Sequence, residues 1–146
     1  YSDNALANIL GGGYIGKTQS LAHNENLKAV TNFAVSLLTE LKNSKQVILF
    51  SKKILEFKDD LNLILEVMSI CIEDIIKIKC ESENLCKLKP YGMELKDVEP
   101  EFSVEALCEI SRLISALREK LEFNANLTVS VDNFLLKMLE VKYLCK

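Results

Sequence analysis

Residues 60–80 read DLNLILEVMSICIEDIIKIKC, and this stretch decides the fold. It contains no glycine or proline, and its apolar residues recur at helical spacing on one side, with Leu63, Val67 and Ile70 on the other. A helix with one side in water could not carry so many apolar residues. We therefore expect a helix over about 60–80 at the centre of a helical bundle.

The segments on either side also have the pattern of helices. Neither glycine nor proline occurs from Lys17 to Lys89 or from Glu101 to Lys146, whereas strands need turn residues every 8 to 12 positions or so. The sequence thus predicts an all-α bundle, with Ser103 as an N-cap. Further helices are expected over about 2–10, 14–22, 25–43, 45–57 and 103–122, and a last one after 123–128. The apolar residues of the 45–57 helix are Val47, Leu49, Phe50, Ile54 and Phe57.

One long connection interrupts this pattern. Pro90, Gly92 and Pro100 all fall between the helix that ends near residue 80 and the helix that begins near residue 103. A connection of about twenty residues is long for a compact domain. Two alternatives stay open, a short helical turn within it or a mobile loop.

Composition narrows the classes of function. The chain has 146 residues, 49% of them hydrophobic, and a net charge of −3, which argues against direct binding of a phosphate backbone by this piece. It has no apolar run of the roughly 20 residues that span a bilayer and no signal peptide, so we expect a soluble protein with no membrane partner. Because it begins at Tyr1 rather than at a methionine, we expect an excised C-terminal piece of a longer protein.

The five cysteines lack paired CxxC spacing. Metal binding through Cys80 and Cys86 is one interpretation, but the only histidine, His23, lies far away in the sequence. The favoured interpretation is reduced thiols used as small apolar residues, and hence a cytoplasmic protein without a metal site.

No catalytic constellation is evident in the sequence. His23 is isolated, so a capping or surface position is favoured over a functional role. Asp59 and Asp60 are interpreted as charges that oppose a helix dipole. Glu73 and Asp74, inside the apolar helix, are interpreted as a solvated edge; the alternative is a salt bridge to a partner or to one of the two arginines, which are Arg112 and Arg118.

The stretch LGGGYIGKTQ, residues 10–19, has the spacing of a phosphate-binding P-loop. A P-loop needs a buried strand before the loop, so that helix N-terminal N–H groups can hold the phosphates. The preceding SDNALANIL has helical spacing instead. We therefore interpret this stretch as a turn between helices, without a cofactor; its key residues are Gly11, Gly13, Gly16 and Lys17.

Two stretches together resemble the delta-prime family of bacterial DNA polymerase III clamp loaders. CEISRLISALREKLEFNANLTVSVDNFLLKML resembles the final two helices of that family, where an arginine, a leucine three residues later, an Asn-x-Asn pair and a run of leucines recur. The corresponding residues here are Arg118, Leu121, Asn124, Asn126, Leu127, Phe134, Leu135, Leu136 and Leu139.

The opening ANILGGGYIGKTQSL resembles the end of the lid domain in the AAA+ module of that family. Its active relatives present a sensor 2 arginine to the nucleotide, and the matching position here is Gly16, which agrees with a member without ATPase activity. Two departures are Thr18, where the family has alanine, and Glu73 in IEDII (residues 72–76), where the family has arginine. The second departure reverses a charge.

The resemblance implies a remnant of the lid domain at residues 1–22 and a helical collar domain at residues 23–146. Such a collar performs no bond chemistry: it is an accessory part of a DNA polymerase holoenzyme and packs against the gamma/tau and delta subunits while the complex loads a sliding clamp onto primed DNA, so that DNA is reached only indirectly. Outward residues of the last two helices and of the 25–43 helix are candidates for these contacts, together with Arg112, Arg118, Asn124 and Asn126. The asparagines are alternatively helix-terminating and capping residues.

Two functions of other classes remain as alternatives. The main one is a stand-alone helical adaptor that binds peptides or partner helices in a groove. The other is a small helical enzyme, which the lack of a convergent polar cluster disfavours.

Overall fold

The computed structural model describes residues 3–11, 26–123 and 126–144. These ranges contain seven α-helices, joined in part by short 3-10 turns, and no strand, which confirms the predicted all-α bundle. The helices are α1 (Asp3–Gly11), α3 (Leu27–Thr39), α4 (Val47–Glu56), α5 (Leu61–Lys79), α6 (Gly92–Val98), α7 (Val104–Glu122) and α8 (Leu127–Leu144).

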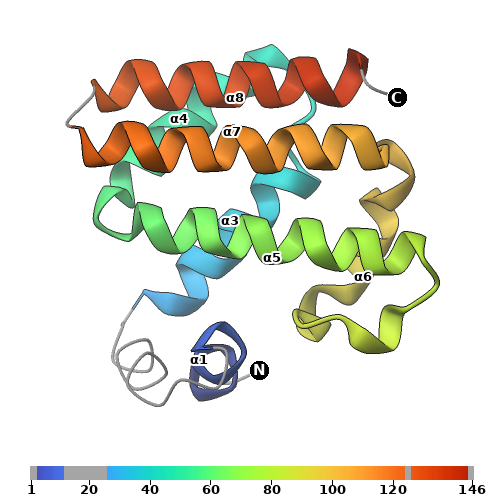
Figure 1. Ribbon diagram of the computed structural model, residues 1–146. Helices are drawn as coiled ribbons and strands as arrows, with labels where there is room; N and C mark the ends of the chain where they lie inside the picture. Colours follow the sequence, from blue (N-terminus) through green and yellow to red (C-terminus); the bar gives the residue numbers. More distant parts are fainter. Residues whose placement is uncertain (1–2, 12–25, 124–125, 145–146) are drawn as a thin grey trace.

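Helix α5 lies at the centre of the bundle, as its sequence predicts. It packs against α3 on one side and α7 on the other, and α6 covers its C-terminal end (Figure 1). Leu63 and Val67, the apolar residues behind the main stripe, are buried together with Ile64 and Met68. The wide apolar surface of this helix therefore corresponds to neighbours on several sides, while Asn62 and Glu73 are exposed on the remaining side.

Helices α7 and α8 form an antiparallel pair, and α8 is the outermost helix of this layer (Figure 1). The other neighbour of α8 is α4, which lies behind the α7–α8 pair in this view. Helix α8 thus has α7 and α4 as its main neighbours, while α5 contacts α3, α6 and α7. This difference leaves part of the surface of α8 open to solvent.

The connection between α5 and α7 is an ordered helical segment and not a mobile loop. It contains α6 and three 3-10 turns, at Glu83–Leu85, Lys89–Tyr91 and Glu99–Glu101. The carboxylate of Asp74 on α5 accepts hydrogen bonds from the backbone N–H groups of Lys87, at 2.9 Å, and Leu88, at 2.8 Å. Leu88 and Leu95 of the connection are buried in the core.

The interpretation of Glu73 and Asp74 as a solvated edge is wrong for Asp74, whose side chain is fully buried. Its charge is balanced by the two N–H groups and by Lys77, at 3.9 Å, instead of by an arginine. Glu73 is exposed and pairs with Lys87 at 3.8 Å. A buried carboxylate is stable at this position because the backbone N–H groups of Lys87 and Leu88, in the segment between two 3-10 turns, donate hydrogen bonds to it.

Two predicted details of the 25–57 region differ from the structure. Helix α3 ends at Thr39 instead of near residue 43, because Asn43 and Gln46 form a capping box that starts the next helical segment. Leu49, expected in the core, is 66% exposed, whereas Ser51 is buried on the α8 side of α4.

Helix α1 packs against α3, and its Leu6, Ala7 and Leu10 belong to the same hydrophobic core as the rest of the bundle. Gly11 is its last residue. Gly13, Gly16, Lys17, His23 and the helix expected over 14–22 lie outside the described residues. The predicted division at residues 22 and 23 therefore stays a prediction.

Candidate protein-interaction site

Exposed apolar side chains follow the contact between α4 and α8. Ile48 on α4 is 65% exposed, and Val129, Leu136 and Tyr143 on α8 are each about half exposed. Leu55, two turns after Ile48, is half-buried. We call these five residues the α4–α8 seam.

Two hydrogen bonds set the register of this pair of helices. The Ser51 hydroxyl donates to the Asp132 carboxylate, and the Tyr143 hydroxyl donates to the Lys42 carbonyl just before α4. The chain order of these partners is reversed between the two segments, so α4 and α8 run antiparallel. In that register Ile48 lies at the level of Leu136, and Leu55 at the level of Val129.

Helical periodicity puts the five seam residues on one face. Relative to Ser51, Ile48 and Leu55 are rotated toward one side of α4, and relative to Asp132 the three α8 residues are rotated toward the same side of the pair. The buried residues Val47 and Ile54 on α4, and Leu135 and Leu139 on α8, lie on the opposite side of Ser51 and Asp132, toward the core. Positions 129, 136 and 143 are spaced by seven residues, which gives one continuous apolar row along α8.

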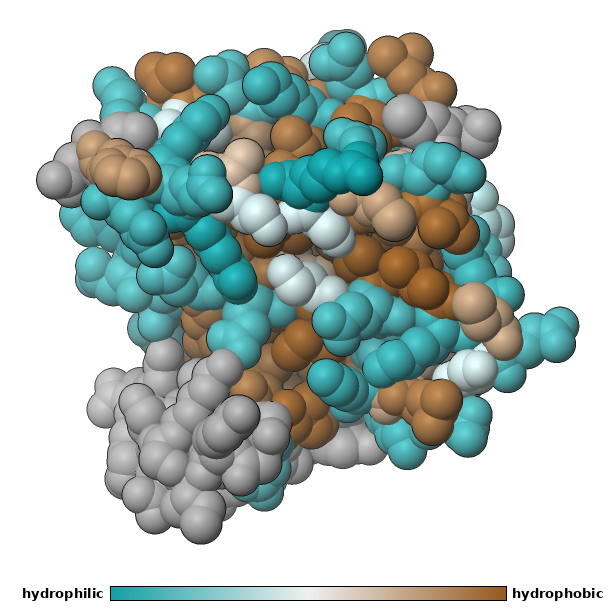
Figure 2. All heavy atoms as spheres, viewed as in Figure 1, coloured by the Kyte–Doolittle hydropathy of each residue, from teal (hydrophilic) through white to brown (hydrophobic). Residues whose placement is uncertain are grey.

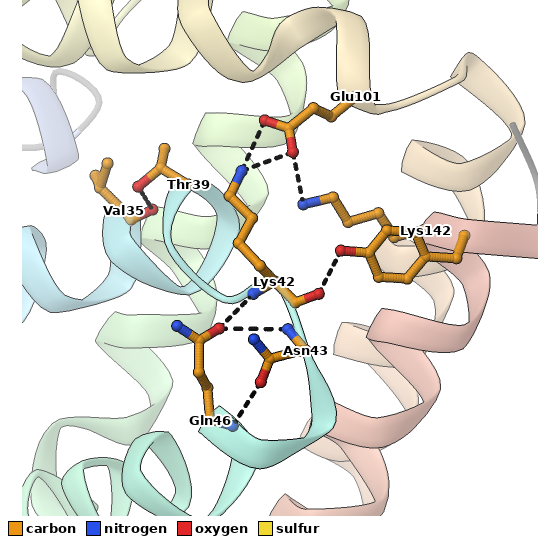
Figure 3. Close-up of polar contacts among 8 residues, drawn as sticks. Val35, Thr39, Lys42, Asn43, Gln46, Glu101 and Lys142 are labelled. Atoms are coloured by element: carbon orange, nitrogen blue, oxygen red, sulfur yellow. Dashed lines mark hydrogen bonds and ion pairs between the residues drawn. The ribbon is translucent and has the colours of Figure 1, made fainter.

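A charged cluster holds the C-terminal end of α8 in place (Figure 3). Glu101 accepts from the Lys42 ammonium with both oxygens, at 2.6 and 2.7 Å, and lies 3.3 Å from the Lys142 Nζ. The Lys142 side chain is buried, with its Nζ 4.8 Å from the centre of the Phe102 ring. The cluster joins the α3–α4 connection, the segment before α7 and helix α8.

The cluster shifts the pKa values of its members. Burial raises the pKa of Glu101, but the hydrogen bond from Lys42 and the charge of Lys142 outweigh it and lower the pKa below its ordinary value. Burial and the charge of Lys42 lower the pKa of Lys142, while Glu101 opposes both effects. Two cations thus share one carboxylate, and Tyr143 is fixed next to them by its bond to Lys42.

The part of the surface seen in Figure 2 mixes polar and apolar residues, with hydrophobic side chains along its upper margin, over α8. On the other side of α4, Leu49 and Phe50 line a groove of about 410 Å³ between α3 and α4. The groove is also lined by the charged residues Glu40, Lys52, Lys53 and Glu56. Helix α4 therefore borders two partly apolar surfaces.

The residues singled out in the sequence as partner contacts do not converge. Arg112 is exposed on α7 and pairs with Glu109. Arg118 is half-buried, and its Nε makes no hydrogen bond to the described residues. Asn126 is an N-cap, because its side chain accepts from the N–H of Val129 at 3.2 Å. Asn124 lies outside the described residues.

Of the helices expected to present outward contacts, α8 has the apolar face, whereas the exposed residues of α3 are mostly polar or small. Sequence reasoning missed Ile48. The available signal was the run VILF at 47–50, four consecutive apolar residues that cannot all share the buried side of one helix.

Metal and membrane sites are not evident in the described ranges. No three His, Cys, Asp or Glu side chains there are placed to hold a metal ion. Cys71, Cys80, Cys86 and Cys108 are free thiols. None of the described helices combines the length and the apolar character that crossing a bilayer requires.

Comparison of the chain with protein-family models, with curated proteins and with solved structures finds no match.

Proposed function

We propose that this chain is a non-catalytic assembly module that holds a partner protein by helix packing on the α4–α8 seam. The observation that carries the proposal is the apolar row of Val129, Leu136 and Tyr143 beside Ile48, exposed on helices that are themselves anchored to the core. Covering exposed apolar surface contributes about 25 cal/mol per Å². Contiguous apolar side chains at a rigid surface are typical of protein-interaction sites.

The kind of assembly that we propose is the collar of a clamp loader. Its support is the resemblance of residues 108–139 to the delta-prime family, together with an all-α bundle in which these residues form the α7–α8 pair. The partners would then be the gamma/tau and delta subunits, and primed DNA would be reached only through the complex. Free thiols support a reducing compartment such as the cytoplasm.

A stand-alone adaptor is the second proposal, and the groove between α3 and α4 favours it. A volume of about 410 Å³ with Leu49 and Phe50 in its lining is suited to a large apolar side chain of a peptide. In this case the α3–α4 groove, and not the α4–α8 seam, would be the main binding site.

Light scattering on a gel-filtration column tests the first proposal. The chain is run alone and then mixed with the collar domain of the gamma/tau subunit from the same source, and we expect a heteromeric peak at micromolar concentration. The double variant Ile48→Asp/Leu136→Asp should abolish that peak. Met93→Asp is the matched control, because Met93 is equally apolar and 80% exposed but lies on α6.

Two results would contradict the proposal. An unchanged heteromeric peak with Ile48→Asp/Leu136→Asp would exclude the seam as the interface. A chain that elutes separately from gamma/tau at every concentration tested, while the seam variants behave as the parent does, would exclude the collar assignment for the isolated chain and favour the adaptor.

A further inference from the structure

The two borders of the α4–α8 seam differ in charge. On the α4 side, the exposed charged residues are Lys45, Lys52 and Glu56, and neither lysine forms an ion pair within the described residues. On the α8 side, the nearest charged residues are Glu140 and Lys137, which balance each other. One border of the apolar row therefore has a net positive charge, and the other has no net charge.

The two lysines of the α4 border are seven residues apart. Seven residues are about two helical turns, or about 10 Å along the axis, so Lys45, in the 3-10 turn that leads into α4, and Lys52, on α4, lie on the same side. Ile48 lies between them in the sequence, one turn from Lys52. The basic border thus runs parallel to the apolar row instead of interrupting it.

From this arrangement we infer that the seam binds an amphipathic helix whose apolar face is flanked, on one side only, by carboxylates about two turns apart. This inference rests on the proposed function, since it names the partner chemistry of the same surface. The apolar row from Val129 to Tyr143 has a length of about 21 Å at 1.5 Å per residue. A partner helix of about four turns covers it.

A second copy of this chain fits the surface less well. Its own seam offers Glu56 and Glu140 against Lys45, Lys52 and Lys137, so an isologous dimer leaves a net positive charge at the interface. Charge complementarity mainly selects the partner and its orientation, while the apolar row supplies most of the affinity. The partner is therefore a different protein with an acidic amphipathic helix.

Fluorescence anisotropy with two designed helical peptides of about 16 residues tests this inference. Both peptides have leucines at heptad spacing; one has glutamates along one flank, and the other has lysines at the same positions. We expect the acidic peptide to bind the 146-residue chain about ten-fold more tightly, with a preference that weakens as salt is added.

The charge-reversed variant Lys45→Glu/Lys52→Glu should invert the preference, so that the basic peptide binds more tightly. Lys28→Glu/Lys120→Glu is the matched control, because it changes the net charge equally at exposed sites on α3 and α7. This control should keep the acidic preference. Circular dichroism of each variant confirms that the helices are intact.

The outcomes separate the partner inference from the proposed function. Equal binding of both peptides, lost in Leu136→Asp, would overturn the inference about charge and leave the seam as a docking site. Binding of neither peptide, or a homodimer that Leu136→Asp dissociates, would overturn the inference as well. The column experiment with gamma/tau then decides independently whether the assembly function stands.

Discussion

Asp74 and Leu88 are joined by a hydrogen bond of 2.8 Å between the carboxylate of one and the backbone N–H of the other, and both residues are fully buried. This bond joins two residues that are fourteen positions apart in the sequence and holds the segment after α5 against the core. It fixes the path of the connection between α5 and α7, and Lys79 and Glu99, 3.0 Å apart, hold the connection again near its end.

Asp74→Ala should destabilise the protein by about 3 kcal/mol, because it leaves the N–H groups of Lys87 and Leu88 without an acceptor. Urea unfolding measures the loss, and hydrogen exchange at these two amides should show lower protection. The matched control is Glu73→Ala, which removes the neighbouring exposed carboxylate and should change the free energy of unfolding by less than about 0.5 kcal/mol. Equal effects of the two variants would refute the assigned bonds.

Glu101→Gln should destabilise the protein by about 1 to 3 kcal/mol, because it leaves the buried ammonium of Lys142 without its carboxylate. The lower part of this range is expected, since more than a third of the Glu101 side chain is exposed. Lys142→Met, which replaces the cation by an apolar side chain of similar length, should be near neutral or stabilising. Thermal unfolding of both variants tests this contrast.

Glu101 should also make the stability of the protein depend on pH in the acid range. The pKa of Glu101 is lowered in the folded state, so its contribution to stability is fully present above its ordinary value of 4.5 and is lost as the pH falls through the lowered value. Stability measured from pH 6 down to about 3 should therefore fall less in Glu101→Gln than in the parent. Parallel curves for the two proteins would count against this assignment.

Alkaline pH should destabilise the protein through Cys71. Burial, and next the charge of Asp74, raise the pKa of this thiol far above its ordinary value of 9.0. The unfolded chain therefore loses a proton that the folded chain keeps, and stability should fall above about pH 9, by at most about 1.4 kcal/mol per pH unit for this group. Cys71→Ala should flatten the fall between pH 8 and 10, whereas the exposed control Cys108→Ala should not.

Glu81→Gly should stabilise the protein by about 1 kcal/mol. Glu81 has a left-handed backbone, with φ of 58°, and follows the C-cap of α5. The bonds from Glu81 N–H to the Ile78 carbonyl and from Ser82 N–H to the Lys77 carbonyl form a Schellman motif, which favours glycine at this position. Glu119→Gly, an exposed position inside α7, should instead cost about 1 kcal/mol. Chemical denaturation of both variants gives the comparison.

The sequence by itself determined the helices and the centre of the bundle. The stretch 61–79 is apolar over most of its circumference, so its packing against several neighbours follows from composition and periodicity, although Asn62 and Glu73 keep one narrow side exposed. The long segments without glycine or proline likewise favour helices over strands. These properties are local, and they hold whichever neighbours the helix has.

Only the tertiary structure decided what Asp74 binds and which apolar residues stay exposed. The carboxylate of Asp74 accepts hydrogen bonds from the N–H groups of Lys87 and Leu88, thirteen and fourteen residues further along the chain. No local sequence pattern predicts hydrogen bonds over that separation. The run VILF at 47–50 shows that some apolar residues of α4 must remain uncovered. Because α8 packs on the side of α4 that carries Ser51, Ile48 and Leu49 remain exposed. The α4–α8 seam therefore depends on which side of α4 is covered by α8.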